Sequence, residues 1–108
     1  MQVKYSDAVK HSGEDFALLQ QATRQLAEVL GPSAGLVESE WDRSEDARDR
    51  TLYTLTIRDW TGKTQTQFSP DELTYPGHVR IRLHHLWGGL LQARYEQDLQ
   101  SLQASSGV

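Results

Sequence analysis

Apolar residues recur at helical spacing throughout residues 76–103, and a helix of this length constrains any fold that the chain can adopt. One line of the pattern consists of Val79, Leu83, Leu86, Leu90 and Ala93. A second line consists of Trp87, Leu91, Tyr95, Leu99 and Leu102. Because residues three and four positions apart share one face of an α-helix, the sequence predicts a long amphipathic helix over 76–103.

Residues 78–83 also fit a second interpretation. Val79, Ile81 and Leu83 alternate with Arg80 and Arg82, as they would along a β-strand. The alternation is confined to this short segment, whereas the helical spacing continues over about 25 residues. We therefore expect a helix here, and a strand remains the alternative.

The pair Gly88-Gly89 lies inside this predicted helix. Each glycine in a helix interior costs about 0.8–1 kcal/mol relative to alanine, so the pair needs a structural reason. Three reasons are open: close packing of Gly89 and Ala93 against another element, a kink, or a groove for a partner. We favour close packing within the domain, with Ala22 and Ala27 of an earlier helix as the small residues opposite.

That earlier helix is predicted over 13–30. Its apolar stripe consists of Phe16, Leu19, Ala22, Leu26 and Val29. Ser12 and Asp15 have the spacing of a capping box at its start, and Gly31-Pro32 supplies a stop at its end.

Three segments between the helices alternate with the period of β-strands. They are 35–42, 51–60 and 64–68, and the short connections between them predict an antiparallel meander. The segment SPDEL at 69–73 then predicts a single helical turn, with Ser69 as its N-cap.

The expected fold is α+β: helix, three-stranded antiparallel meander, long helix (α-β-β-β-α), with both helices on one face of the sheet. With 108 residues the chain has room for one domain. Residues 1–11 are expected to form a flexible arm, 12–103 the folded core and 104–108 a frayed tail.

Few residues are equipped for catalysis or for metal binding. The chain has no cysteine, which excludes thiol chemistry and thiolate metal sites. His84 and His85 diverge by about 100° on a helix, and no acidic residue of that segment completes a metal site with His78. No serine lies in a G-x-S-x-G pattern, and there is no glycine-rich nucleotide-binding loop. We expect a non-enzymatic protein that needs no cofactor.

The location is expected to be cytoplasmic, without membrane insertion. No apolar run approaches the about 18 residues of a membrane span, and the N-terminal residues lack the apolar stretch of a secretory signal.

The order helix, three strands, helix resembles that of the double-stranded-RNA-binding domain, and this resemblance implies nucleic-acid binding as an alternative function. That family presents lysines at the start of its last helix, where this chain has Arg80, Arg82 and no lysine. The net charge is −4 at pH 7, and phosphate neutralisation supplies most nucleic-acid affinity. We therefore do not expect nucleic acid as the partner.

A protein partner, or a second copy of this chain, is the expected ligand. A strand of six residues spans about 20 Å, whereas 28 helical residues span about 42 Å, so the last helix extends past the sheet with apolar residues that need cover. Aromatic and arginine side chains are enriched at the centres of interfaces. The candidate partner-binding residues are Arg80, Trp87, Tyr95, Leu99, Leu102 and Trp60.

Overall fold

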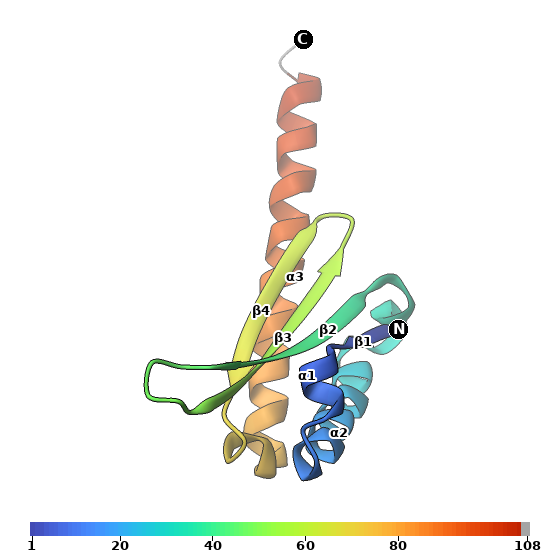
Figure 1. The fold of residues 1–108 in the computed structure, drawn as a ribbon. Coiled ribbons are helices and arrows are strands. Elements are labelled where there is room, and N and C mark those ends of the chain that lie inside the picture. Colours follow the sequence, from blue (N-terminus) through green and yellow to red (C-terminus); the bar gives the residue numbers. More distant parts are fainter. Residues whose placement is uncertain (107–108) are drawn as a thin grey trace.

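The structure, a computed structural model, describes residues 1–106. Four strands form one sheet in the order β1 (Gln2–Tyr5), β2 (Glu38–Glu45), β3 (Thr51–Asp59) and β4 (Gly62–Phe68). β1 runs parallel to β2, and the other neighbours are antiparallel. The helices are α1 (Asp7–Lys10), α2 (Glu14–Leu30) and α3 (Pro76–Ser106), with 3-10 turns η1 (Gly31–Leu36) and η2 (Glu72–Thr74). The predicted α+β class is confirmed, and α2 and α3 lie on the same face of the sheet (Figure 1).

The prediction for residues 1–11 was wrong, because they do not form a loose arm. β1 pairs with β2 from Gln2 opposite Glu38 to Tyr5 opposite Trp41, which makes the sheet four-stranded and mixed. α1 follows directly, and its Val9 is fully buried in the core. The resulting order, β1-α1-α2-β2-β3-β4-α3, departs from the double-stranded-RNA-binding arrangement by one strand and one helix.

α2 has the predicted extent, but it begins without the predicted capping box. Its N-cap is Gly13, and no side chain caps the helix. The Ser12 hydroxyl instead donates to the carbonyl of Val9 at 2.5 Å, and the Asp15 carboxylate accepts a 2.6 Å hydrogen bond from Tyr53. Ser12 therefore bonds to the last turn of α1, Asp15 joins α2 to β3, and neither side chain caps α2.

One face of the meander packs against the helices. Trp41 of β2 and the β3 residues Tyr53, Leu55 and Ile57 point toward the helices and are fully buried. Burying one large apolar side chain contributes about 1.5–3 kcal/mol, so this face supplies much of the driving force for folding. A polar link crosses the same layer, because Thr23 of α2 accepts a 2.9 Å hydrogen bond from the Trp41 indole N–H.

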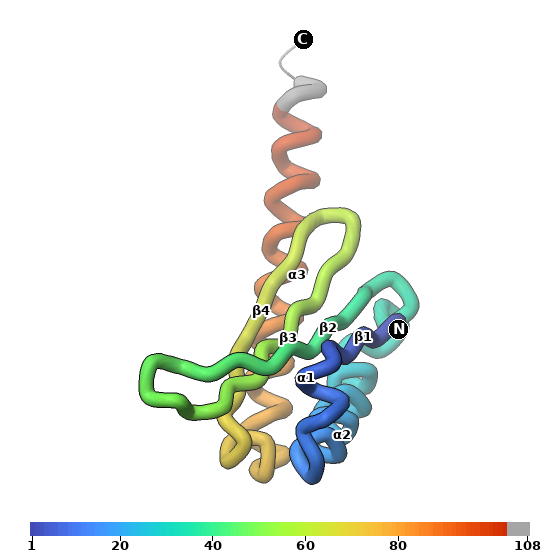
Figure 2. The backbone as a smooth tube through the Cα atoms, in the orientation of Figure 1, coloured from blue at the N-terminus to red at the C-terminus, as the bar shows by residue number. Residues whose placement is uncertain are grey.

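α3 is one continuous helix from Pro76 to Ser106, so the helical interpretation of residues 78–83 is confirmed and Gly88-Gly89 does not break it. Its buried residues are Val79, Leu83, Leu86 and Leu90. The C-terminal part projects past the β3–β4 hairpin (Figures 1 and 2), in agreement with an elongated molecule of 56 × 32 × 24 Å. Of the predicted frayed tail 104–108, residues up to Ser106 continue the helix, and 107–108 lie outside the described residues.

Candidate interaction surface

Large apolar side chains lie exposed along the side of α3 that faces away from the sheet. We call them the outer stripe, and they are Ile81, Leu91, Tyr95, Leu99 and Leu102. Each has an exposed fraction between 38% and 66%. Successive helical residues are rotated by about 100°, which puts the stripe roughly opposite the buried side of α3. None of the five stripe residues belongs to the buried core of the domain.

The outer stripe is longer than the part of the last helix that the sequence predicted to extend past the sheet. Every residue from Tyr95 to Gln103 is exposed, as expected for a helix that has left the sheet behind. Ile81, however, lies about one and a half turns from the helix start, where α3 still packs on the domain through Val79 and Leu83. Apolar residues thus mark the outer side of α3 over most of its length.

Gly88 and Gly89 have different surroundings. A Cβ atom on Gly89 would lie 3.1 Å from the Thr64 methyl group of β4, so Gly89 permits close approach of helix and sheet. The predicted close packing is confirmed, but the neighbour is β4 rather than the first helix. A Cβ atom on Gly88 would meet nothing within 4 Å. At about 20° from Tyr95 in helical rotation, Gly88 forms a gap in the outer stripe.

Arg94 of α3 lies close to two tryptophan rings, that of Trp60 in the turn between β3 and β4 and that of Trp87 on α3. The Arg94 guanidinium lies 4.7 Å from the ring centre of Trp60 and 5.5 Å from that of Trp87. Such contacts contribute roughly 0.5–1 kcal/mol or more when partly desolvated. Trp60 is 64% exposed, whereas Trp87 is half-buried and packs against the core. The pair therefore flanks the outer stripe at the point where α3 leaves the sheet.

Asp59 fixes Arg94 in this position. Its carboxylate is fully buried and accepts a 2.8 Å hydrogen bond from Arg94, as well as bonds of 2.8 and 2.5 Å from the backbone N–H and hydroxyl of Thr61. Burial alone would raise the pKa of Asp59, but the hydrogen bonds from Arg94 and Thr61 outweigh it and hold the pKa below its ordinary value. The hairpin tip is thus clamped to α3.

Arg80 and Arg82 are both engaged inside the fold. Arg80 pairs with Glu28 of α2 at 3.0 Å. Arg82 pairs with Glu72 at 2.8 Å and also donates to Thr66 of β4. The backbone N–H of Ser69 above all, together with His78 and Arg82, holds the pKa of Glu72 below its usual range. Arg80 flanks the outer stripe, but its charge is satisfied within the domain.

Of the candidate residues, Tyr95, Leu99 and Leu102 share the outer stripe, while Trp60, Trp87 and Arg80 lie beside it. Sequence reasoning missed Ile81, Leu91 and Gly88 as members of the surface. The sequence signal that could have identified Ile81 and Gly88 is a seven-residue repeat, because Ile81, Gly88, Tyr95 and Leu102 follow one another at that interval.

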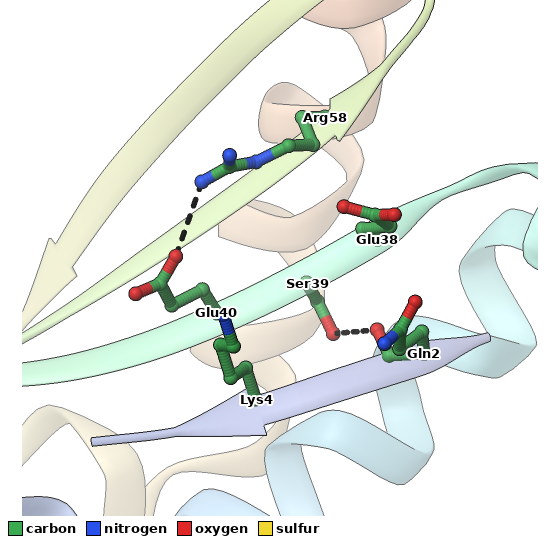
Figure 3. A pocket seen from close by; sticks show the side chains of 6 residues that line it. All are labelled: Gln2, Lys4, Glu38, Ser39, Glu40 and Arg58. Atoms are coloured by element: carbon green, nitrogen blue, oxygen red, sulfur yellow. Dashed lines mark hydrogen bonds and ion pairs between the residues drawn. The ribbon is translucent and has the colours of Figure 1, made fainter.

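The outer face of the sheet is polar. A shallow pocket crosses β1, β2 and β3 there (Figure 3), lined by Gln2, Lys4, Glu38, Ser39, Glu40 and Arg58. Arg58 pairs with Glu40 at 3.1 Å, and both side chains are nearly half exposed. Pairs of this kind contribute a few tenths to about 1 kcal/mol and are ordinary for a solvated sheet.

Two further properties concern the described residues. Among them, no group of three His, Asp or Glu side chains could hold a metal ion. Within 1–106, none of the helices combines the length and the apolarity that crossing a bilayer demands.

Comparisons with known proteins identify no relative: no protein-family model, curated protein or solved structure matches this chain.

Proposed function

We propose that this chain is a small, non-enzymatic, cytoplasmic interaction or assembly module that binds a protein partner through the outer stripe of α3. The observation that carries the proposal is the stripe itself. Five large apolar side chains lie in line on a rigid helix, and their own domain leaves each of them well exposed. Contiguous apolar surface of this kind is typical of protein interfaces.

The surroundings of the stripe support the same use. Trp60 and Trp87 stand beside it, and their Arg94 partner is held by the buried carboxylate of Asp59. Tryptophan and arginine are the residue types most often found at the energetic centres of interfaces. Because the bond between Asp59 and Arg94 fixes these side chains before a partner binds, little side-chain entropy remains to be lost on binding.

The polar residues argue for binding rather than for chemistry. The ion pairs Glu72–Arg82 and Glu40–Arg58 join neighbouring elements of the fold, so these two carboxylates make structural contacts. Arg80, which would have to serve nucleic-acid binding, is paired with Glu28. These pairings favour a protein partner over the nucleic-acid alternative.

A pair of matched variants tests the proposal. Tyr95→Glu with Leu102→Glu places two charges on the outer stripe. Gln97→Glu with Gln100→Glu places two charges on the other side of the same exposed helix segment. Each tagged protein is expressed in its native cells, cross-linked and recovered, and the associated proteins are quantified by mass spectrometry.

We expect the wild type and the Gln97/Gln100 variant to recover the same partner, either another protein or untagged copies of this chain, and the Tyr95/Leu102 variant to lose it. Circular dichroism should show unchanged folding for all three proteins, since the substituted side chains are exposed. Recovery of identical sets by all three proteins contradicts the proposal. Microscopy of a fluorescent fusion tests the cytoplasmic location, which a membrane or extracellular signal contradicts.

A further inference from the structure

We propose that the occupant of the outer stripe is the outer stripe of a second copy, with the two α3 helices antiparallel about a two-fold axis midway between Leu91 and Gln92. This inference rests on the proposed function, because it names the partner of the same surface. It follows from the spacing of the stripe, the distribution of charge along α3 and the position of the domain behind the helix.

The spacing of the stripe is self-complementary. Ile81, Gly88, Tyr95 and Leu102 recur every seven residues, the interval that keeps side chains in the seam between two packed helices. In a two-fold interface, residue i contacts residue j and residue j contacts residue i. Reversal about the proposed axis sets Ile81 opposite Leu102 of the other copy and Gly88 opposite Tyr95.

The pairing of Gly88 with Tyr95 matches small to large. Gly88 has open space where its side chain would be, and Tyr95 is the bulkiest member of the stripe, with 63% of its surface exposed. The aromatic ring of one copy can therefore lie over the bare backbone at Gly88 of the other. The two-fold axis produces this contact twice in each dimer. A parallel pairing in register would set Tyr95 against Tyr95 and leave the two glycines facing each other.

The charges along α3 also favour the antiparallel arrangement. The acidic residues Glu96 and Asp98 both lie in the C-terminal half of α3, and residues 76–91 contain no acidic residue. Reversal places the acidic half of one copy beside residues 76–91 of the other, so the acidic residues of the two copies lie at opposite ends of the contact. A parallel pair would bring Glu96 and Asp98 of both copies together, where like charges repel.

The shape of the molecule permits this dimer. Because the outer stripe lies on the far side of α3 from the sheet, two copies can meet helix to helix with their sheets on the outside (Figure 1). From Ile81 to Leu102 the contact is about 31 Å long. At these exposed fractions the stripe exposes on the order of 500 Å² per copy. A standard interface buries about 800 Å² per partner, and polar side chains beside the stripe would supply the difference.

Sedimentation velocity from low micromolar to millimolar concentration tests the dimer. The wild type should shift from monomer to dimer, and Tyr95→Ala should raise the dissociation constant at least tenfold, because each dimer loses two aromatic contacts. Gln97→Ala, an exposed substitution off the stripe, should leave the dissociation constant unchanged. A wild type that stays monomeric throughout overturns the inference, and so does an equal effect of the two substitutions.

Disulfide trapping tests the orientation, since the chain has no native cysteine. Gly88→Cys and Tyr95→Cys are made in separate chains. In the antiparallel dimer, a mixture of the two should give a mixed disulfide dimer under mild oxidation, and each chain alone should give far less. Rapid cross-linking of each chain to itself indicates a parallel pair and overturns the proposed arrangement.

The two proposals fail in different ways. A monomeric wild type whose captured partner is a different protein, lost from the Tyr95/Leu102 variant, overturns the self-association and leaves the interaction module standing. A chain that neither dimerises nor loses any partner with that variant overturns both.

Discussion

Replacing Gly89 by alanine tests the close contact between α3 and β4. The new methyl group would lie 3.1 Å from the Thr64 methyl group. Thr64 cannot simply rotate away, because its hydroxyl donates a 3.0 Å hydrogen bond to the carbonyl of Leu86 on α3. Either that hydrogen bond is lost or helix and sheet move apart.

Two opposing effects determine how much Gly89→Ala changes the free energy of unfolding. Alanine in place of glycine stabilises a helix interior by about 0.8–1 kcal/mol. Overpacking a well-filled site costs about 1–3 kcal/mol. We therefore expect Gly89→Ala to leave the free energy of unfolding unchanged or to lower it by up to about 2 kcal/mol. Gly88→Ala, which meets no neighbour, should raise the same quantity by about 0.8–1 kcal/mol.

Urea unfolding followed by circular dichroism measures both variants, at a concentration where sedimentation shows only monomer. Thr64→Ser supplies the decisive control, because it removes the methyl group and keeps the hydroxyl. In the Thr64→Ser background, Gly89→Ala should recover most of the stabilisation that Gly88→Ala shows. Equal stabilisation by Gly88→Ala and Gly89→Ala in the wild-type background would refute the steric reasoning.

Two further predictions concern buried polar contacts. Because the folded pKa of Asp59 is depressed, the stability from its bond to Arg94 is present above the unfolded pKa of about 3.9 and is lost as the pH falls through the folded value. The wild type should therefore lose more unfolding free energy below about pH 4 than Asp59→Asn, and parallel pH curves for the two proteins would contradict this. Thr23→Val removes the acceptor of the Trp41 N–H and should lower the free energy of unfolding by about 1–3 kcal/mol in thermal or urea unfolding. A change under about 0.5 kcal/mol would show that this hydrogen bond contributes little.

The elements that sequence could predict are those with long periodic patterns. α2 and α3 repeat their apolar residues over several turns, and β3 alternates Tyr53, Leu55 and Ile57 without interruption. β1 has only four residues, and its partner β2 lies beyond α2, so local alternation gave too little signal. The predicted capping box of Ser12 and Asp15 does not form, because Ser12 bonds to Val9 and Asp15 bonds to Tyr53 instead.

The interaction surface was predictable only in part, for a geometric reason. α3 has apolar residues on two sides, and the sequence cannot state which side the sheet will cover. Tyr95, Leu99 and Leu102 could be identified because they lie past the reach of the strands. Ile81 could not, because it lies beside buried Val79 and also fitted the strand interpretation. The contact of Trp60 with Arg94 joins segments far apart in the chain and needs the hairpin to be placed first.

We expect Gly88 to affect both the stability of the monomer and the affinity of the dimer. Packing against Thr64 explains Gly89, whereas no contact within the domain offsets the cost of Gly88 to the helix. If the space at Gly88 receives Tyr95 of a second copy, Gly88→Gln should act in opposite directions on two measurements. The monomer should gain roughly 0.5–1 kcal/mol in urea unfolding, because glutamine is a far better helix former. The dimer should weaken by at least about 30-fold in sedimentation, because each dimer contains two filled gaps that cost about 1–3 kcal/mol each. A variant that gains monomer stability and keeps its dimer affinity would remove the reason proposed for this glycine.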